Sequence, residues 1–277
     1  MLKPEPWLAE VLNRSILVTG APRSGTTLLG NLLHSCNDVE YIFEPQVVLP
    51  LLPLIGSLDD STWRCLFETT LVAEGMADRI AGRSINLNPH DDSYFGRVKR
   101  ADSLLCTLPI SGEDGRLGHS WSRAETTAEC LRRTLVWKSP EAGMWARDLK
   151  RLYPGLRVVA IWRSEKEVVR SMIARGWFAG SKEARWFHQD GDMPFWWHRR
   201  RGEGWRKFWI DLDERAKAST LWSSVWGGLG GGGVYIVLYT ELCGKPQEVF
   251  SSLCTFLGLE PGPMTEGLLS TVRREAG

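Results

Sequence analysis

The sequence predicts an α/β protein of three layers, in which helices flank both faces of a central parallel sheet. Short apolar segments of strand character alternate with helical segments along the 277 residues, and a Gly/Pro turn joins the first strand directly to a helix. This alternation favours parallel strands that are connected by helices. The chain is long enough for one large core and contains no internal repeat or evident linker. We therefore expect a single domain over residues 1–277.

The expected strands are short runs of aliphatic, β-branched and aromatic residues, with helices between them. Strands are expected at 16–19, 40–43, 135–138, 156–162 and 234–239, the last apolar enough to be buried on both faces. Helices are expected at 26–36, 62–80, 124–133, 140–153, 164–175, 213–226 and 247–257. Ser139 and Ser164 are the expected N-caps of two helices, and Gly258 ends the last one. A polar stretch at about 82–121 is expected to form an irregular insert.

Composition excludes several classes of function. The chain has 34 Lys and Arg against 33 Asp and Glu, so its net charge of +1 indicates no nucleic-acid partner. It contains no apolar run long enough to span a membrane, which predicts the absence of a transmembrane segment. The 6 cysteines show no C-x-x-C pairing, so we expect reduced thiols, no zinc cluster and a cytoplasmic location.

The segment from Gly20 to Thr27 is the strongest functional signal, because it has the layout of a phosphate-binding loop between a strand and a helix. Gly20 and Gly25 keep the spacing of the nucleotide-triphosphate motif G-x-x-x-x-G-K-[ST]. The position of the motif's lysine is Thr26, however, and the cation stands earlier, at Arg23. We therefore expect a P-loop-type fold whose loop binds a phosphate ester without the usual lysine and Mg²⁺.

The loop and four later segments resemble the PAPS-dependent sulfotransferase family, PAPS being 3′-phosphoadenosine 5′-phosphosulfate. Each motif is weak alone, but the five occur in the family's order over roughly residues 15–260. They are Ala21-Pro22-Arg23-Ser24-Gly25-Thr26-Thr27, Lys138-Ser139-Pro140, Arg157 to Arg163 with Ser171, Tyr239-Thr240-Glu241-Leu242, and Phe256-Leu257-Gly258-Leu259. Thr240 departs from the glutamate that the family usually has there. The Arg/Lys-Gly segment of many phenol-type members is not recognisable in 270–277, where Arg273 or Arg274, or else Lys138, is a candidate substitute.

The resemblance implies roles for particular residues. The loop, as Arg23, Ser24, Gly25, Thr26 and Thr27, would bind the 5′-phosphosulfate, and Arg23 would also counter the charge that builds on the leaving phosphate. Arg163 would hold the 3′-phosphate with two parallel hydrogen bonds, helped by the hydroxyl of Ser171. Tyr239 would contact the adenine, with plain core packing as the equal alternative. The product would be adenosine 3′,5′-bisphosphate, and no metal is required.

Transfer to a hydroxyl needs a base, and Glu44 is the first candidate because it ends a strand-like run close to the loop. Carbohydrate-type members of the family place a glutamate near this position, whereas phenol-type members use a histidine. His34 and His119 are therefore rivals, although His34 is expected to be structural. Lys138 is a candidate catalytic residue, with a solvated lysine at a strand end as its alternative.

The region of about 177–209 is a candidate acceptor site or lid. It interleaves tryptophans with cations, a composition that suits a planar or saccharide-like acceptor, even an anionic one. The alternative is helix packing, which fits the spacing of Trp205 and Trp209 and is preferred for Trp222 and Trp226. The other residues concerned are Trp186, Trp196, Trp197, Lys182, Arg185 and Arg199 to Arg201. Oligomeric state cannot be inferred.

The function that these features predict is in-line transfer of a sulfuryl group from PAPS to a hydroxyl of a small molecule or carbohydrate. Two alternatives stay open. A P-loop kinase or NTPase would use the same fold for ATP, but it would need a lysine at position 26 and an aspartate for Mg²⁺. A non-catalytic nucleotide-binding protein would keep the loop and lack the base.

Overall fold

The computed structural model describes residues 5–80, 122–178, 189–190, 193–194, 204–230 and 232–275. Its main sheet has five parallel strands in the order β2-β3-β1-β4-β7, which confirms the predicted fold class. The strands are β1 (Ile16–Thr19), β2 (Val39–Phe43), β3 (Thr134–Lys138), β4 (Arg157–Trp162) and β7 (Val234–Leu238). A separate antiparallel pair joins β5 (Gln189–Asp190) to β6 (Met193–Pro194).

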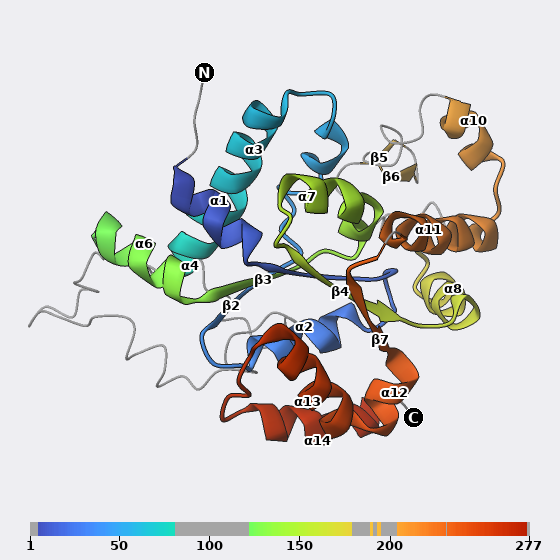
Figure 1. The fold of residues 1–277 in the computed structure, drawn as a ribbon. Coiled ribbons are helices and arrows are strands. Elements are labelled where there is room, and N and C mark those ends of the chain that lie inside the picture. Colours follow the sequence, from blue (N-terminus) through green and yellow to red (C-terminus); the bar gives the residue numbers. More distant parts are fainter. Residues whose placement is uncertain are drawn as a thin grey trace, which may run out of the picture.

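Helices cover both faces of the sheet, as Figure 1 shows. One face carries α2 (Thr26–His34), α12 (Tyr239–Gly244), α13 (Pro246–Leu257) and α14 (Thr265–Glu275). The opposite face carries α1 (Pro6–Asn13), α3 (Asp60–Glu68), α7 (Ala146–Leu152), α8 (Glu165–Ala174) and α11 (Glu214–Leu229). The remaining helices are η1 (Leu52–Leu54), η2 (Thr69–Ala77), α4 (Asp78–Ile80), α6 (Arg123–Arg132), η4 (Glu141–Trp145) and α10 (Gly204–Ile210).

The two faces of the sheet build two hydrophobic cores. Residues of β1 alternate between them, because side chains along a strand point to opposite faces: Leu17 belongs to one core, Ile16 and Val18 to the other. In the first core Trp63 stacks on Phe67 with ring centroids 4.6 Å apart, and Trp137 meets Phe67 edge to face. Burial on both faces explains why the inner strands are almost continuously apolar.

The prediction that residues 234–239 form a strand buried on both faces is wrong. Among the described residues, β7 pairs only with β4 and lies at an edge of the sheet, and its Ile236 is 53% exposed. The strand also ends one residue early, at Leu238, and Tyr239 begins α12. Apolar composition predicted the strand correctly but could not show that one of its edges has no neighbour.

Several helices differ in detail from the sequence prediction. The helical stretch at 62–80 is present, but its middle is the π-helix η2. Glu141 begins a 3₁₀ helix and Ser139 provides no side-chain cap. Ser164 stands at the predicted N-cap position of α8, yet its hydroxyl donates to Glu167 and caps no backbone amide. Patterns of residue type locate a helix more reliably than they determine its hydrogen bonding.

Helices α1, α10 and α14 were not predicted, and α11 continues past its expected end. It runs through Gly227 and Gly228 to Leu229. A Cβ at Gly228 would lie 2.4 Å from the carbonyl oxygen of Gly143, so the glycine allows α11 to approach η4 closely. No helix in the described part of the chain is long and apolar enough to cross a membrane.

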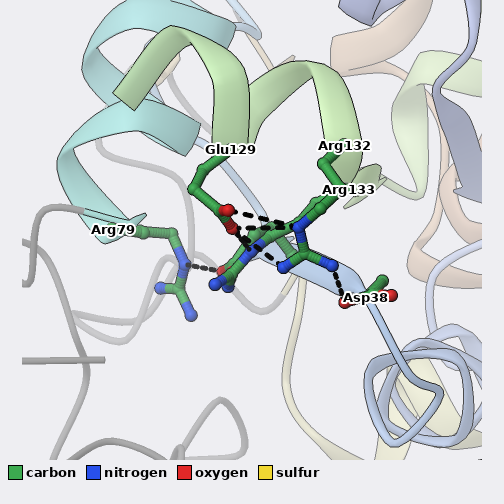
Figure 2. A network of polar contacts seen from close by, with 6 residues as sticks. Asp38, Arg79, Glu129, Arg132 and Arg133 are labelled. Atoms are coloured by element: carbon green, nitrogen blue, oxygen red, sulfur yellow. Dashed lines mark hydrogen bonds and ion pairs between the residues drawn. The ribbon is translucent and has the colours of Figure 1, made fainter. Parts of the chain in front are cut away.

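A network of charges lies where β2 begins, at the edge opposite to the carboxyl ends of the strands (Figure 2). It joins α4 and α6 to β2 and contains Asp38, Glu40, Arg79, Glu129, Arg132 and Arg133. Glu129 accepts from Arg132 at 2.8 Å and from Arg133 at 3.0 Å, and Arg133 also pairs with Glu40. The hydrogen bonds from Arg132 hold the pKa of Glu129 below its ordinary value.

The network makes stability depend on pH. Because the pKa of Glu129 is lowered in the folded state, its contribution is complete above the ordinary carboxyl pKa and is lost as pH falls through the folded value. We expect Glu129→Gln to lower the free energy of unfolding by about 1–2 kcal/mol at pH 7 and by less in acid. Urea unfolding from pH 7 to 3 measures both effects, with Glu10→Gln, on an exposed face of α1, as the matched control. A constant difference at all pH values would contradict the assignment.

Candidate active site at the carboxyl edge of the sheet

A pocket of about 660 Å³ lies where the strands end. Each of the five strands contributes the segment that follows it, because parallel strands all end at the same edge. The lining residues are Pro22, Arg23, Gly25 to Leu28, Asn31, Leu32, Glu44, Gln46, Leu49, Ser139 to Glu141, Arg163, Trp177, Tyr239, Leu268 and Thr271. The pocket therefore brings together Arg23, Glu44, Arg163 and Tyr239, which are far apart in the sequence.

The loop between β1 and α2 needs its two glycines. Gly20 has φ 137° and Gly25 has φ 103°, backbone conformations that residues with a Cβ rarely adopt. A Cβ at Gly20 would lie 2.5 Å from the carbonyl oxygen of Ile161, and one at Gly25 would lie 2.7 Å from the ring of Tyr239. Arg23 has φ 70° and occupies the same left-handed region without being glycine. Such strain is concentrated at functional sites.

The loop delivers polar groups to the start of α2. Gly25 is the N-cap residue and no side chain caps the helix, which leaves the first amide groups and the positive end of the helix dipole at the pocket. Ser24 is fully buried beneath the loop, and its hydroxyl has no hydrogen-bond partner in the described structure. Ser24 does not line the pocket itself. Thr26 and Thr27 line it from the first turn of α2.

The predicted pair Arg163 and Ser171 meets the loop directly. The Nε of Arg23 donates to the Ser171 hydroxyl at 3.3 Å, and a terminal nitrogen of Arg163 donates to the Arg23 carbonyl at 3.4 Å. The Arg163 guanidinium also lies 4.4 Å from the centre of the Tyr239 ring, a cation–π contact. Both guanidinium groups are therefore held at the β1, β4 and β7 side of the pocket.

Glu44 lines the opposite side of the pocket and pairs with Lys138, which does not line it. Lys138 ends β3 with a side chain that is 0% exposed, and its ammonium donates to Glu44 and, at 3.2 Å, to the Thr27 hydroxyl. The ammonium also lies 4.0 Å from the centre of the Phe43 ring. This buried environment differs from that of a solvated lysine at a strand end, which is the alternative for Lys138. Glu44 has φ 39°, a second strained position at the pocket.

The other predicted candidates lie elsewhere. His34 is buried near the end of α2, with its ring 5.2 Å from that of Tyr41, and does not line the pocket. Trp222 and Trp226 pack on each other at 6.1 Å, as predicted from their spacing. The side chains of Arg273 and Arg274, His119, the insert at 82–121 and most of 177–209 fall outside what the structure describes.

Sequence reasoning missed several residues that line the pocket. The segment after β2 contributes Gln46 and Leu49, and the segment after β3 contributes Glu141. Trp177 follows α8. Helix α2 contributes Asn31, and α14 contributes Leu268 and Thr271. The order of the strands would have placed Gln46 and Glu141, since both closely follow strands. No local signal distinguishes Leu268 and Thr271, because α14 reaches the pocket only through tertiary packing against α2 and α13.

A family model described as "Sulfotransferase family" matches residues 15–263. This match spans most of the chain, and the chain therefore belongs to the sulfotransferase family. Sulfuryl transfer is the reaction class that the family and the fold support. The comparison with curated protein sequences gave no match.

Similar solved structures are also sulfotransferases. A sulfotransferase domain from the curacin biosynthetic pathway is 17% identical, with a TM-score of 0.48, and the match covers 93% of this chain and 77% of that one. Sulfotransferase STF9 from Mycobacterium avium is 15% identical, with a TM-score of 0.45 and coverage of 98% and 70%. Because both scores are low, the family assignment depends on the sequence match and the fold on the sheet itself.

The ion pair between Glu44 and Lys138 predicts coupled stability effects. Glu44→Gln leaves the buried ammonium without its carboxylate, so we expect a loss of about 1–3 kcal/mol in the free energy of unfolding, reduced by the partial exposure of Glu44. Lys138→Met should be similarly costly, and the double variant should lose less than the sum of the two. Urea unfolding of the four proteins measures this coupling. Strictly additive losses would show that the two side chains do not interact.

Proposed function

We propose that this chain transfers a sulfuryl group from PAPS to a hydroxyl group of a small-molecule or carbohydrate acceptor. The observation that carries the proposal is the pocket, in which two guanidinium groups, a helix N-terminus and a carboxylate paired with a buried lysine meet at one sheet edge. The donor has anionic groups at both ends of its nucleotide. The two arginines provide a binding site for each end.

The residues on the β1, β4 and β7 side suit the donor. The uncapped start of α2 suits a phosphate at the loop, and Thr26 and Thr27 line the pocket beside it. Arg163 would bind the 3′-phosphate from the end of β4, with Ser171 nearby on α8. The ring of Tyr239, stacked on Arg163, offers the adenine an aromatic contact. No group of three metal-ligating side chains gathers in the described residues, and the proposal needs none.

The carboxylate side suits the acceptor. The donor supplies an activated sulfuryl group, whose sulfur–oxygen bond to the 5′-phosphate breaks as the acceptor oxygen bonds to sulfur. Glu44 takes the proton of the acceptor hydroxyl, and Arg23 stabilises the charge that develops on the departing phosphate. Lys138 pairs with Glu44 and fixes the direction of its carboxylate, while its ammonium also donates to the Thr27 hydroxyl of the loop. The pair therefore ties the base to the donor site.

A kinase or NTPase remains the alternative, and the loop argues against it. Thr26 stands where an ATP-binding loop has its lysine, and Lys138 ends β3 where an aspartate for Mg²⁺ would be expected. Lys138 of β3 does bring an ammonium group to Thr27, but this group is already paired with Glu44. The nucleotide preference decides between the two functions.

Calorimetric titration tests the donor site. The protein should bind adenosine 3′,5′-bisphosphate more tightly than ATP with Mg²⁺, and Arg163→Ala should weaken the bisphosphate by about 10–100-fold, because a bidentate contact to phosphate is lost. Arg170→Ala, an exposed arginine on the same helix as Ser171, is the matched control and should bind normally. Preference for ATP with Mg²⁺ would refute the proposal, and unchanged affinity in Arg163→Ala would remove that residue from the site.

The role of Glu44 is tested by transfer kinetics. With a panel of hydroxyl acceptors, release of adenosine 3′,5′-bisphosphate from PAPS should fall by about 10²–10⁴-fold in Glu44→Gln, because general-base assistance is lost. Binding of the bisphosphate should be retained, which separates loss of the base from loss of the fold. If the folded variant keeps most of the activity, another residue is the base.

A further inference from the structure

Arg163 occupies the single position between a strand and a helix. β4 ends at Trp162, and Ser164 is the N-cap residue of α8. The two peptide units that flank Arg163 therefore set the direction of its side chain. Ser164 gives no side-chain cap to hold this junction, because its hydroxyl donates to Glu167.

Besides its cation–π contact with Tyr239, the Arg163 side chain makes polar contacts that are long. Its hydrogen bond to the Arg23 carbonyl measures 3.4 Å, and its Nε lies 3.8 Å from the Glu167 carboxylate. Ordinary hydrogen bonds from nitrogen to oxygen are about 2.9 Å. The Nε is buried and makes no hydrogen bond within the described structure. These hydrogen-bonding contacts fix the guanidinium little, so its direction depends on the Tyr239 ring and on the backbone at Arg163.

The carbonyl group of Arg163 is held by a side chain from another helix. Trp222 of α11 donates its indole N–H to the carbonyl oxygen of Arg163 at 3.1 Å. Helix α11 packs along α8, so the indole approaches the junction from a rigid support. Trp226, one turn further along α11, contacts Trp222 with ring centroids 6.1 Å apart, but its own buried N–H has no hydrogen-bond partner in the described residues.

We propose that Trp222 is a positioning residue for the 3′-phosphate site, because its hydrogen bond fixes the peptide that aims the Arg163 guanidinium. The inference depends on the proposed function, in which Arg163 holds that phosphate. It assigns to Trp222 a role beyond the helix packing that its spacing predicts. Trp222 acts through Arg163 and does not itself line the pocket.

The experiment compares two ligands that differ only in the 3′-phosphate. The ratio of the Kd for adenosine 5′-phosphate to the Kd for adenosine 3′,5′-bisphosphate measures the affinity that the 3′-phosphate adds. We expect Trp222→Phe to lower this ratio by about 3–10-fold, the value of one hydrogen bond, and to leave the Kd for adenosine 5′-phosphate unchanged. In an Arg163→Ala background, Trp222→Phe should have no further effect on the ratio.

Trp226→Phe is the matched control, since it makes the same substitution on the same helix and removes an N–H that bonds nothing in the described structure. Its ratio should equal that of the wild type. Thermal unfolding checks that both variants are folded, and Trp222→Met provides a second variant without the donor.

Three results would overturn the inference: a ratio unchanged in Trp222→Phe, an equal fall in Trp226→Phe, or a further fall in the Arg163→Ala background. Failure of the proposed function gives a different result, because wild-type protein would then show no gain in affinity from the 3′-phosphate at all. The two failures are therefore distinguishable.

Discussion

The parallel pairing of β1 between β3 and β4 is the constraint on which the rest of the structure depends. The register sets Val18 beside Lys138 and Thr19 beside Ala160, so the three central strands run the same way and end within a few residues of one another at one edge. The chain must then leave all of them at the same edge, and each exit contributes to one pocket. The sheet is packed closely enough there that a Cβ at Gly20 would lie 2.5 Å from the Ile161 carbonyl oxygen. The sharp turn after β1, which presents Arg23 and the start of α2, follows from this crowding.

Strand order also sorts the charges of the site. Arg23 follows β1 and contacts Ser171, and Arg163 follows β4 and contacts Tyr239. The carboxylates of Glu44 and Glu141 follow β2 and β3. Lys138 links the loop to the carboxylate side, because its ammonium donates to Thr27 and to Glu44. Under the proposed function, an anionic donor and a hydroxyl acceptor would therefore occupy different halves of one pocket, with Glu44 where they meet.

Much of the site could be predicted because its residues follow strands or lie in short motifs. The glycines of the loop, Arg163 at the end of β4 and Glu44 at the end of β2 are recognisable from local pattern alone. The pairing of Glu44 with Lys138 is not, because it joins residues 94 apart through neighbouring strands. The same holds for Trp222 and for Leu268 of α14, which act through helix packing, and for β7, whose exposed edge depends on strand order. Local pattern predicts which residues stand at the ends of elements, and tertiary contacts decide what those residues touch.

The central claim is that one pocket holds both phosphate groups of the donor, one on the loop after β1 and the other on the arginine after β4. A crystal structure with adenosine 3′,5′-bisphosphate tests it most directly. The 5′-phosphate should lie at the amides of Gly25 to Thr27 beside Arg23, and the 3′-phosphate should lie within hydrogen-bond distance of Arg163 and Ser171. A nucleotide bound in the reverse direction, or with its 3′-phosphate away from Arg163, would contradict it.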